Sequence, residues 1–422
     1  MKLKKLLVAL FAAVMFATIL PLTASAEEVK NNPQGSGYAQ TLNSGLSSNG
    51  VVCNLKSESC RLSGPTSDND KMFSQYVDVV FENNPGNVTY GTLAGSRLSG
   101  PDKKFYNAVK AEATKIANGE RTSTIISIPL SKFTSSTTIK ASEFGYSSIN
   151  DYNAQDIFNA WCAKYFDIDL SKVYNALDFD LAYELYWHDK TIGVSYDVTA
   201  GNNPVTSIGK TTMTLNPSYG YKFYMHVSKD FKGSSTYSTN PNKTSAAKKA
   251  KANAASIVAS ASGSDYDKIQ YYFNKVSGLS EYNYDAVNYD YDYGNPWQMI
   301  WVFDGDPSTK VVCEGYSKAF QYLCDKTKFA STKTRSILVT GDMSYYLGGY
   351  GPHMWNVVRM NDGKNYTIDA TNGVSLVDAP ATSGTNGGLY YTRYNVPSAG
   401  YYYFTLDKYT QAAYSSASYT IS

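Results

Sequence analysis

The 422-residue chain is predicted to be an α+β protein with two folded parts. Between residues 71 and 243, helix-like apolar spacing is interspersed with short alternating strands, which is typical of an α+β domain. From residue 244 onward, two helices and a strongly apolar helix precede a pair of strands. This order predicts a helix packed on an antiparallel sheet, preceded by an accessory α+β domain.

The elements follow from local signals. In the accessory domain, 71–243, we expect helices near 105–118 and 154–164 and strands near 124–129, 191–198, 210–215 and 222–227. The polar segment 233–242 is the predicted linker. After it come a helix over 245–262 and a second helix, opened by a capping box at Ser264 and Asp267 and running to Val276, within a domain spanning 244–422. The aromatic run 401–404 and the alternating residues 418–421 are predicted to complete the sheet of this domain, with a separate hairpin as the alternative.

The first 26 residues have the pattern of an export signal. A basic start precedes an apolar run over 6–22 and the small residues Ala24, Ser25 and Ala26. We therefore expect a secreted, extracellular protein without a membrane anchor, because no second apolar run of spanning length appears. The tail shows no wall-attachment pattern, and residues 27–70 are predicted to be a flexible polar leader.

The charge and the amino-acid composition limit the classes of molecule that the protein is expected to bind. The chain has 38 basic and 36 acidic residues, and the signal carries three of the lysines, so the exported form has a charge of about −1 and nucleic acid is not an expected partner. The 38 tyrosines are explained by amphipathic packing, with carbohydrate or cell-wall binding through stacked rings as the alternative. An extracellular protein or peptide is the expected substrate.

Five cysteines in an exported chain leave at least one thiol unpaired. Cys53 and Cys60 lie close together in a polar segment and are predicted to form a disulfide. Cys162 and Cys324 lie in apolar helical settings, which favours buried, inert thiols. Cys313 remains as the best-placed nucleophile.

The segment VCEGYSKAFQYL places Cys313 at the start of a helix. Unpaired N–H groups and the positive end of the helix dipole favour a thiolate there, and the same N–H groups can receive an oxyanion. A thiolate also needs a base, and the chain has only three histidines. His188 and His226 fall in the accessory domain, where hydrogen-bonded structural histidines are expected, whereas His353 follows a glycine-rich segment and opens a strand over 353–360.

The next strand, 364–371, carries Asp369 in an apolar setting. A three-residue loop over 361–363 would pair Met360 with Lys364 and place Asp369 opposite Trp355, so that Asp369 becomes a diagonal neighbour of His353 on one face. A two-residue Asp-Gly loop would put the two side chains on opposite faces. The register therefore tests the assignment.

The motifs VCEGYSKAFQYL, HMWNVV and YTIDATN, in this order, resemble the core of the transglutaminase-like superfamily over residues 265–372. The segment YELYWHDKT, 183–191, is similar to the N-terminal part of exported Gram-positive bacterial proteins that carry this core. The resemblance implies a papain-like arrangement in which Cys313 attacks an amide carbonyl, His353 exchanges the proton and Asp369 orients the imidazole.

Residues near the nucleophile are candidates for binding. The Gln298 amide is the preferred second oxyanion donor, with the indoles of Trp297 and Trp301 as alternatives. Aromatic residues are the candidates for the walls of a cleft: Trp297, Trp301, Tyr316 and Trp355.

Other chemistries fit less well. Zinc needs three or four ligands, and the histidines are too few and the cysteines too scattered, so no metal or other cofactor is expected. The acidic segment 285–292 fits a solvated turn better than a calcium loop. Three classes remain: an acyltransferase that crosslinks or deamidates proteins, a cysteine protease or amidase acting on wall peptides, and a non-catalytic adhesion or wall-binding protein.

Overall fold

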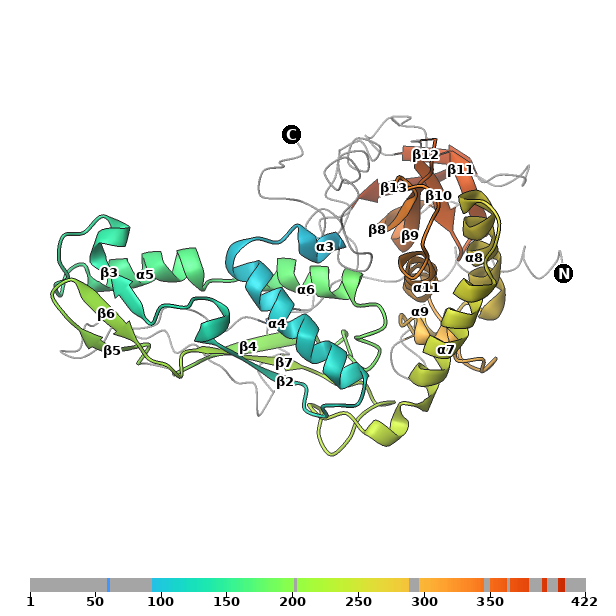
Figure 1. Ribbon diagram of the computed structural model, residues 1–422. Helices are drawn as coiled ribbons and strands as arrows, with labels where there is room; N and C mark the ends of the chain where they lie inside the picture. The colour runs from blue at the N-terminus through green and yellow to red at the C-terminus, as the bar shows by residue number, and fades with distance from the viewer. Residues whose placement is uncertain are drawn as a thin grey trace.

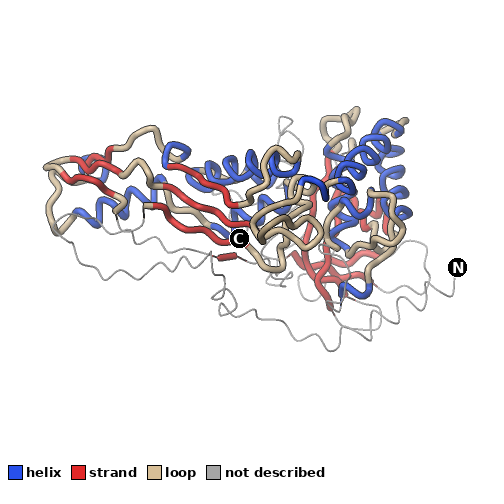
Figure 2. Tube along the Cα trace, turned by 90° about the horizontal axis from the view of Figure 1, so that it is seen from below, coloured by secondary structure: helices blue, strands red, loops and turns tan. Residues whose placement is uncertain are grey.

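The computed structural model describes residues 59–60, 93–200, 203–287, 296–344, 350–362, 365–378, 389–392 and 401–406. The fold mixes helices and antiparallel sheets in two parts that lie side by side (Figures 1 and 2). In the described ranges, none of the helices combines the length and apolarity that crossing a membrane requires. The export signal, most of the leader, Cys53 and the residues 418–421 lie outside these ranges.

The N-terminal part contains the predicted helices and strands and several further ones. Its helices are α3 (Leu93–Ser96), α4 (Gly100–Ala117), α5 (Ala154–Tyr165) and α6 (Leu170–Asp180). One sheet has the order β1 (Ser59–Cys60), β4 (Val194–Thr199), β7 (Gly220–Met225) and β2 (Ile125–Pro129). A second sheet has the order β3 (Thr138–Lys140), β6 (Thr212–Leu215) and β5 (Val205–Ile208), and lies at the end away from the C-terminal part (Figure 1).

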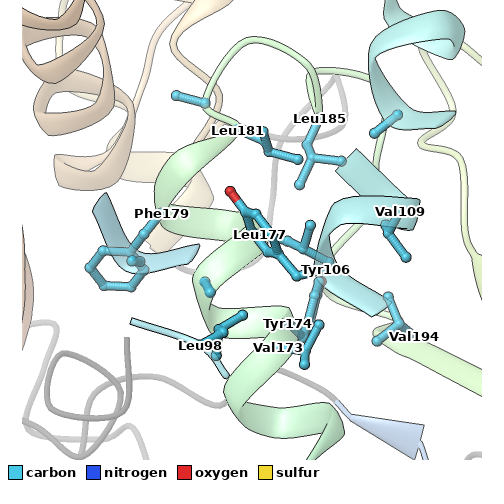
Figure 3. Packing of buried hydrophobic residues seen from close by; sticks show 14 of the residues in the cluster. Leu98, Tyr106, Val109, Val173, Tyr174, Leu177, Phe179, Leu181, Leu185 and Val194 are labelled. Atoms are coloured by element: carbon cyan, nitrogen blue, oxygen red, sulfur yellow. The ribbon is translucent and has the colours of Figure 1, made fainter. Parts of the chain in front are cut away.

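Aromatic and branched side chains form the core between these helices and sheets. Figure 3 shows Tyr106 and Val109 of α4 beside Leu177 of α6, with Val194 of β4 close by. The Tyr106 hydroxyl donates to Asp180 at 2.7 Å, so the tyrosine satisfies its polar end inside the core. Packing of this kind explains many of the tyrosines.

Two predictions for the N-terminal part need correction. Ser59–Cys60 pairs with Val194 and Ser195 as an edge strand, so this dipeptide of the predicted flexible leader has regular structure. The predicted linker over 233–242 is held against the N-terminal part, because Thr239 N–H donates to Thr122 O at 2.9 Å and Tyr237 O accepts from Thr124 N–H at 2.9 Å. A polar side chain of the segment adds to these backbone contacts, since the Thr239 hydroxyl also donates to Thr122 O at 3.2 Å.

The C-terminal part is a helical layer on a six-stranded antiparallel sheet. Its helices are α7 (Ser245–Ser260), α8 (Asp265–Leu279), α9 (Tyr284–Val287), α10 (Ile300–Phe303) and α11 (Cys313–Asp325). The sheet order is β11 (Val374–Asp378), β10 (Asn365–Asp369), β9 (Tyr350–Arg359), β8 (Arg335–Ser344), β13 (Tyr401–Leu406) and β12 (Leu389–Thr392). Two predictions are confirmed: Ser264 and Asp267 form a capping box at the start of α8, and the run 401–404 joins the sheet through β8.

Helix α11 is buried on all sides from Glu314 to Cys324. It packs against α8 and α10 and against β8 and β9. The close approach of the preceding segment depends on Gly315, where an added Cβ would lie 2.6 Å from the Val311 Cβ. Val311 in turn pairs with Tyr282, so it cannot withdraw freely.

We predict that Gly315→Ala lowers the free energy of unfolding by about 1–3 kcal/mol, because the methyl group overpacks this contact. The measurement is a urea denaturation curve of the full chain. Gly278→Ala in α8 is the matched control, because a Cβ there meets nothing within 4 Å, and it should stabilise by about 0.5–1 kcal/mol. Equal stability of Gly315→Ala and the unaltered chain would contradict the packing argument.

Candidate active site

The register of β9 and β10 agrees with the three-residue-loop prediction. Tyr366 pairs with Val358 and Ile368 pairs with Asn356, which sets Asp369 opposite Trp355. His353 and Asp369 therefore share a face, and the His353 Nε2 lies 2.9 Å from the Asp369 Oδ2. The expected diagonal contact is confirmed.

Asp369 is fully buried and receives several donors. Its Oδ1 accepts the backbone N–H groups of Thr371 and Asn372 at 3.1 and 3.2 Å, and its Oδ2 accepts the Asn372 amide at 2.7 Å. Burial opposes the charged form, but the His353 charge and these hydrogen bonds outweigh it and hold the pKa of the carboxyl below its ordinary value. An ionised acid is thereby kept beside the imidazole.

His353 has Cys313 as a second hydrogen-bond partner. Since Nε2 faces Asp369, Nδ1 is the ring nitrogen that can hydrogen-bond to the Cys313 sulfur. Burial lowers the pKa of His353, but the Asp369 charge and hydrogen bond and the contact with Cys313 raise it to about 10. The imidazolium thus contributes stability fully below about pH 6.5, and this contribution is lost as the pH rises through about 10.

Cys313 begins α11, and Val312 before it has an extended backbone. The Val312 N–H donates to Pro296 O at 3.0 Å, which fixes the entry into the helix. The Cys313 side chain is partly exposed, whereas the thiols of Cys162 and Cys324 are buried, as predicted. Of these three thiols, Cys313 combines access with a basic neighbour.

One hydroxyl ties the helix start to the histidine strand. The Ser317 Oγ lies 2.9 Å from Cys313 O and 2.8 Å from Met354 O, so its proton is shared between the two carbonyls. The Asn356 amide of β9 donates to Ser317 O at 3.2 Å. These contacts set the distance between the elements that carry Cys313 and His353.

Gln298, the predicted second oxyanion donor, is buried and hydrogen-bonded. Its side chain is 2% exposed, and its amide donates to the backbone carbonyl of Leu185 at 3.0 Å. The contact joins the segment before α10 to the N-terminal part. One N–H of the Gln298 amide is therefore used for packing the two parts together, and its role as an oxyanion donor stays a prediction.

The four predicted cleft aromatics are all buried. Trp301 stacks on Phe231 at 5.9 Å between ring centroids, and the Tyr316 hydroxyl donates to Ser280 O at 2.8 Å. These two residues therefore belong to the core, and their role in a cleft stays a prediction. Trp355 and Trp297 stay beside the site, since Trp355 stacks on His353 at 6.0 Å and the indole of Trp297 lies under the Lys190 ammonium at 5.7 Å.

The sequence interpretation missed Asn372 and Ser317. Asn372 follows Asp369 by three residues, a spacing at which an amide can return to a carboxylate across a turn, so a local signal existed. Ser317 offered none, because its partner Met354 lies 37 residues away. His188 and His226 are confirmed as hydrogen-bonded structural residues: His188 Nε2 lies 2.6 Å from the Tyr174 hydroxyl and His226 Nε2 lies 3.1 Å from the Tyr237 hydroxyl.

We predict that Asp369→Asn lowers the pKa of His353 from about 10, because the charge that opposes the effect of burial is lost and only the contact with Cys313 still raises the pKa. An NMR titration of the imidazole Cε1–H signals measures it, and only three histidines contribute. A His353 pKa that stays near 10 in this variant would show that Asp369 is not the group that holds the proton.

We predict that Ser317→Ala lowers the free energy of unfolding by about 1 kcal/mol and slows alkylation of Cys313 by iodoacetamide. Thermal unfolding and peptide mass spectrometry of the Cys313 peptide measure the two effects. Ser256→Ala is the control, since Ser256 makes the same kind of bond, to Ala252 O at 3.1 Å, on an exposed helix face. Unchanged alkylation in Ser317→Ala would argue against the positioning role.

Comparisons with known proteins give little support for a family. Neither the protein-family models nor the curated proteins include one that matches the chain. A search of solved structures found a crystal structure of a TGase with 16% sequence identity and a TM-score of 0.27. The match covers 49% of this chain and 51% of that chain, so the chain spans about half the length of the protein it matches. A likeness at this level assigns neither fold nor family.

Proposed function

We propose that the protein is a cysteine-nucleophile acyl-transfer enzyme that acts on protein or peptide amides, as the transglutaminase-like motifs imply. The observation that carries the proposal is the buried chain of contacts from Asp369 through His353 to Cys313. An acid, an imidazole and an accessible thiol in that order are what cysteine acyl transfer requires. In this proposal the three residues form a catalytic triad within a papain-like core.

In the first half-reaction, the Cys313 sulfur attacks the carbonyl carbon of an amide. The electron pair moves to the carbonyl oxygen, and the His353 imidazolium then gives its proton to the departing amine as the C–N bond breaks. The products are a thioester on Cys313 and a free amine, which is ammonia when the substrate is a glutamine side chain.

In the second half-reaction, an acceptor attacks the thioester and His353 takes its proton. A primary amine gives a new amide, which is a crosslink when both partners are proteins, and water gives a carboxylate. In both cases the C–S bond breaks and returns the thiolate. The backbone N–H groups at the start of α11 are the donors proposed for the oxyanion.

We also propose the setting of this chemistry. The N-terminal pattern supports export, so the substrate is an extracellular or cell-wall protein or peptide. The division into an accessory domain over 71–243 and a catalytic domain over 244–422 is part of the proposal.

We predict that the exported form incorporates a labelled primary amine into a glutamine-containing protein, and that Cys313→Ala loses this activity by about 10³-fold or more. Label incorporation, ammonia release and peptide cleavage are followed side by side. The control is Cys162→Ala, which removes a buried thiol in α5 and should retain activity.

The outcomes separate the alternatives. New N-termini without label incorporation would replace the transferase with a cysteine protease. Ammonia release without incorporation would indicate deamidation or amidase activity. Absence of all three signals, together with a Cys313 that does not react with iodoacetamide, would overturn the enzyme proposal in favour of a binding protein.

A further inference from the structure

A balanced cluster of charges surrounds the first two turns of α11. The Lys318 Nζ lies 2.7 Å from the Asp178 Oδ1 and 2.7 Å from the Glu314 Oε1. The other Glu314 oxygen accepts a hydrogen bond from the Lys190 ammonium. The side chains are 2–17% exposed, so water screens these interactions little, and two anions face two cations.

Half of the cluster comes from the N-terminal part. Asp178 belongs to α6, and Lys190 stands in the turn that follows it. The turn is held in place because the Asp189 carboxylate accepts the Thr191 N–H at 3.0 Å, and because the His188 Nδ1 contacts His226 O at 2.8 Å. These hydrogen bonds hold the turn in the position from which the Lys190 ammonium reaches Glu314.

Glu314 directly follows Cys313 in the sequence. A carboxylate in the first turn suits the helix dipole, but an uncompensated anion one residue away from the sulfur in the chain disfavours the thiolate. Lys318 must balance Asp178 as well as Glu314, so it cannot neutralise Glu314 by itself. The second cation, Lys190, completes the balance.

We propose that Lys190 is a positioning residue by which the N-terminal part activates the nucleophile: it neutralises Glu314 and so keeps the start of α11 favourable to the Cys313 thiolate. This inference rests on the proposed function, because it assumes that Cys313 is the nucleophile. It gives the accessory domain a direct part in catalysis without any contact with the substrate.

The other groups around the cluster do not supply this charge. Burial lowers the pKa of His188 to about 4, so this imidazole is neutral at pH 7. Trp297 contributes only its ring face beneath Lys190. His353 is cationic as well, but it already faces Asp369.

The test is the pH dependence of Cys313 alkylation by iodoacetamide in the full chain, followed on the Cys313 peptide by mass spectrometry. In Lys190→Gln the midpoint should rise by about one pH unit, and the rate measured about one unit below the midpoint of the unaltered chain should fall about tenfold. Lys190→Arg should keep the rate within about twofold. Lys164→Gln, which breaks an exposed pair with Glu143 at 3.1 Å, is the control and should change nothing.

The sign of the charge effect separates it from a loss of folding. In Glu314→Gln the midpoint should move down, and the double variant Lys190→Gln with Glu314→Gln should regain the rate of the unaltered chain. A double variant as slow as Lys190→Gln would overturn the proposal. So would an unchanged midpoint in Glu314→Gln, which tests the same idea if Lys190→Gln does not fold.

The readout also distinguishes this inference from the proposed function. Alkylation reports the thiol alone and needs no acyl substrate. If the alkylation midpoints shift as expected but the protein incorporates no amine, the role of Lys190 is retained and the transferase is rejected. If the protein incorporates amine but Lys190→Gln leaves the alkylation midpoint unchanged, the transferase is retained and the role of Lys190 is rejected.

Discussion

The ammonium group of Lys318 is buried, and a buried cation must be matched by anions in direct contact. Its two carboxylates come from different parts of the chain: Glu314 from the same helix and Asp178 from the N-terminal part. Removing one partner of such a pair costs about 3–5 kcal/mol, so this contact sets how the two parts meet. The Lys190 and Gln298 contacts add to the same junction.

The start of α11 is held from the sheet side by neutral hydrogen bonds. Ser317 and Asn356 join the helix to β9 within four residues of His353, and Gly315 allows Val311 to pack closely. The ion pairs of Lys318 on one side of α11, and the Ser317 hydroxyl shared between two carbonyls on the other, restrict the movement of the first turn of the helix. Such support from two directions suits the nucleophile role proposed for Cys313, because catalytic groups must be placed to within a fraction of an ångström.

Local chemistry explains the parts of the fold that the sequence predicted well. The capping box at Ser264 and the helix start at Cys313 depend on residues within one turn. The β9–β10 register depends on the short connection between the strands, and it placed Asp369 beside His353. The contacts of Gln298 with Leu185 O and of Trp301 with Phe231 could not be predicted, since proximity along the chain to Cys313 says little about where a buried side chain finds its partner.

The sequence by itself determined the α+β class and most helices and strands, because periodicity, caps and tight turns act over a few residues. For His353 and Asp369 it left two registers open, and the strand pairing of the structure decided between them. Only the tertiary structure decided what covers the polar side of α11. Lys318 and Asp178 are 140 residues apart, and Lys190 and Glu314 are 124 apart. In sequence, Glu314 and Lys318 look like the solvated face of an amphipathic helix, and burial against a distant segment turned that face into an ion-pair network.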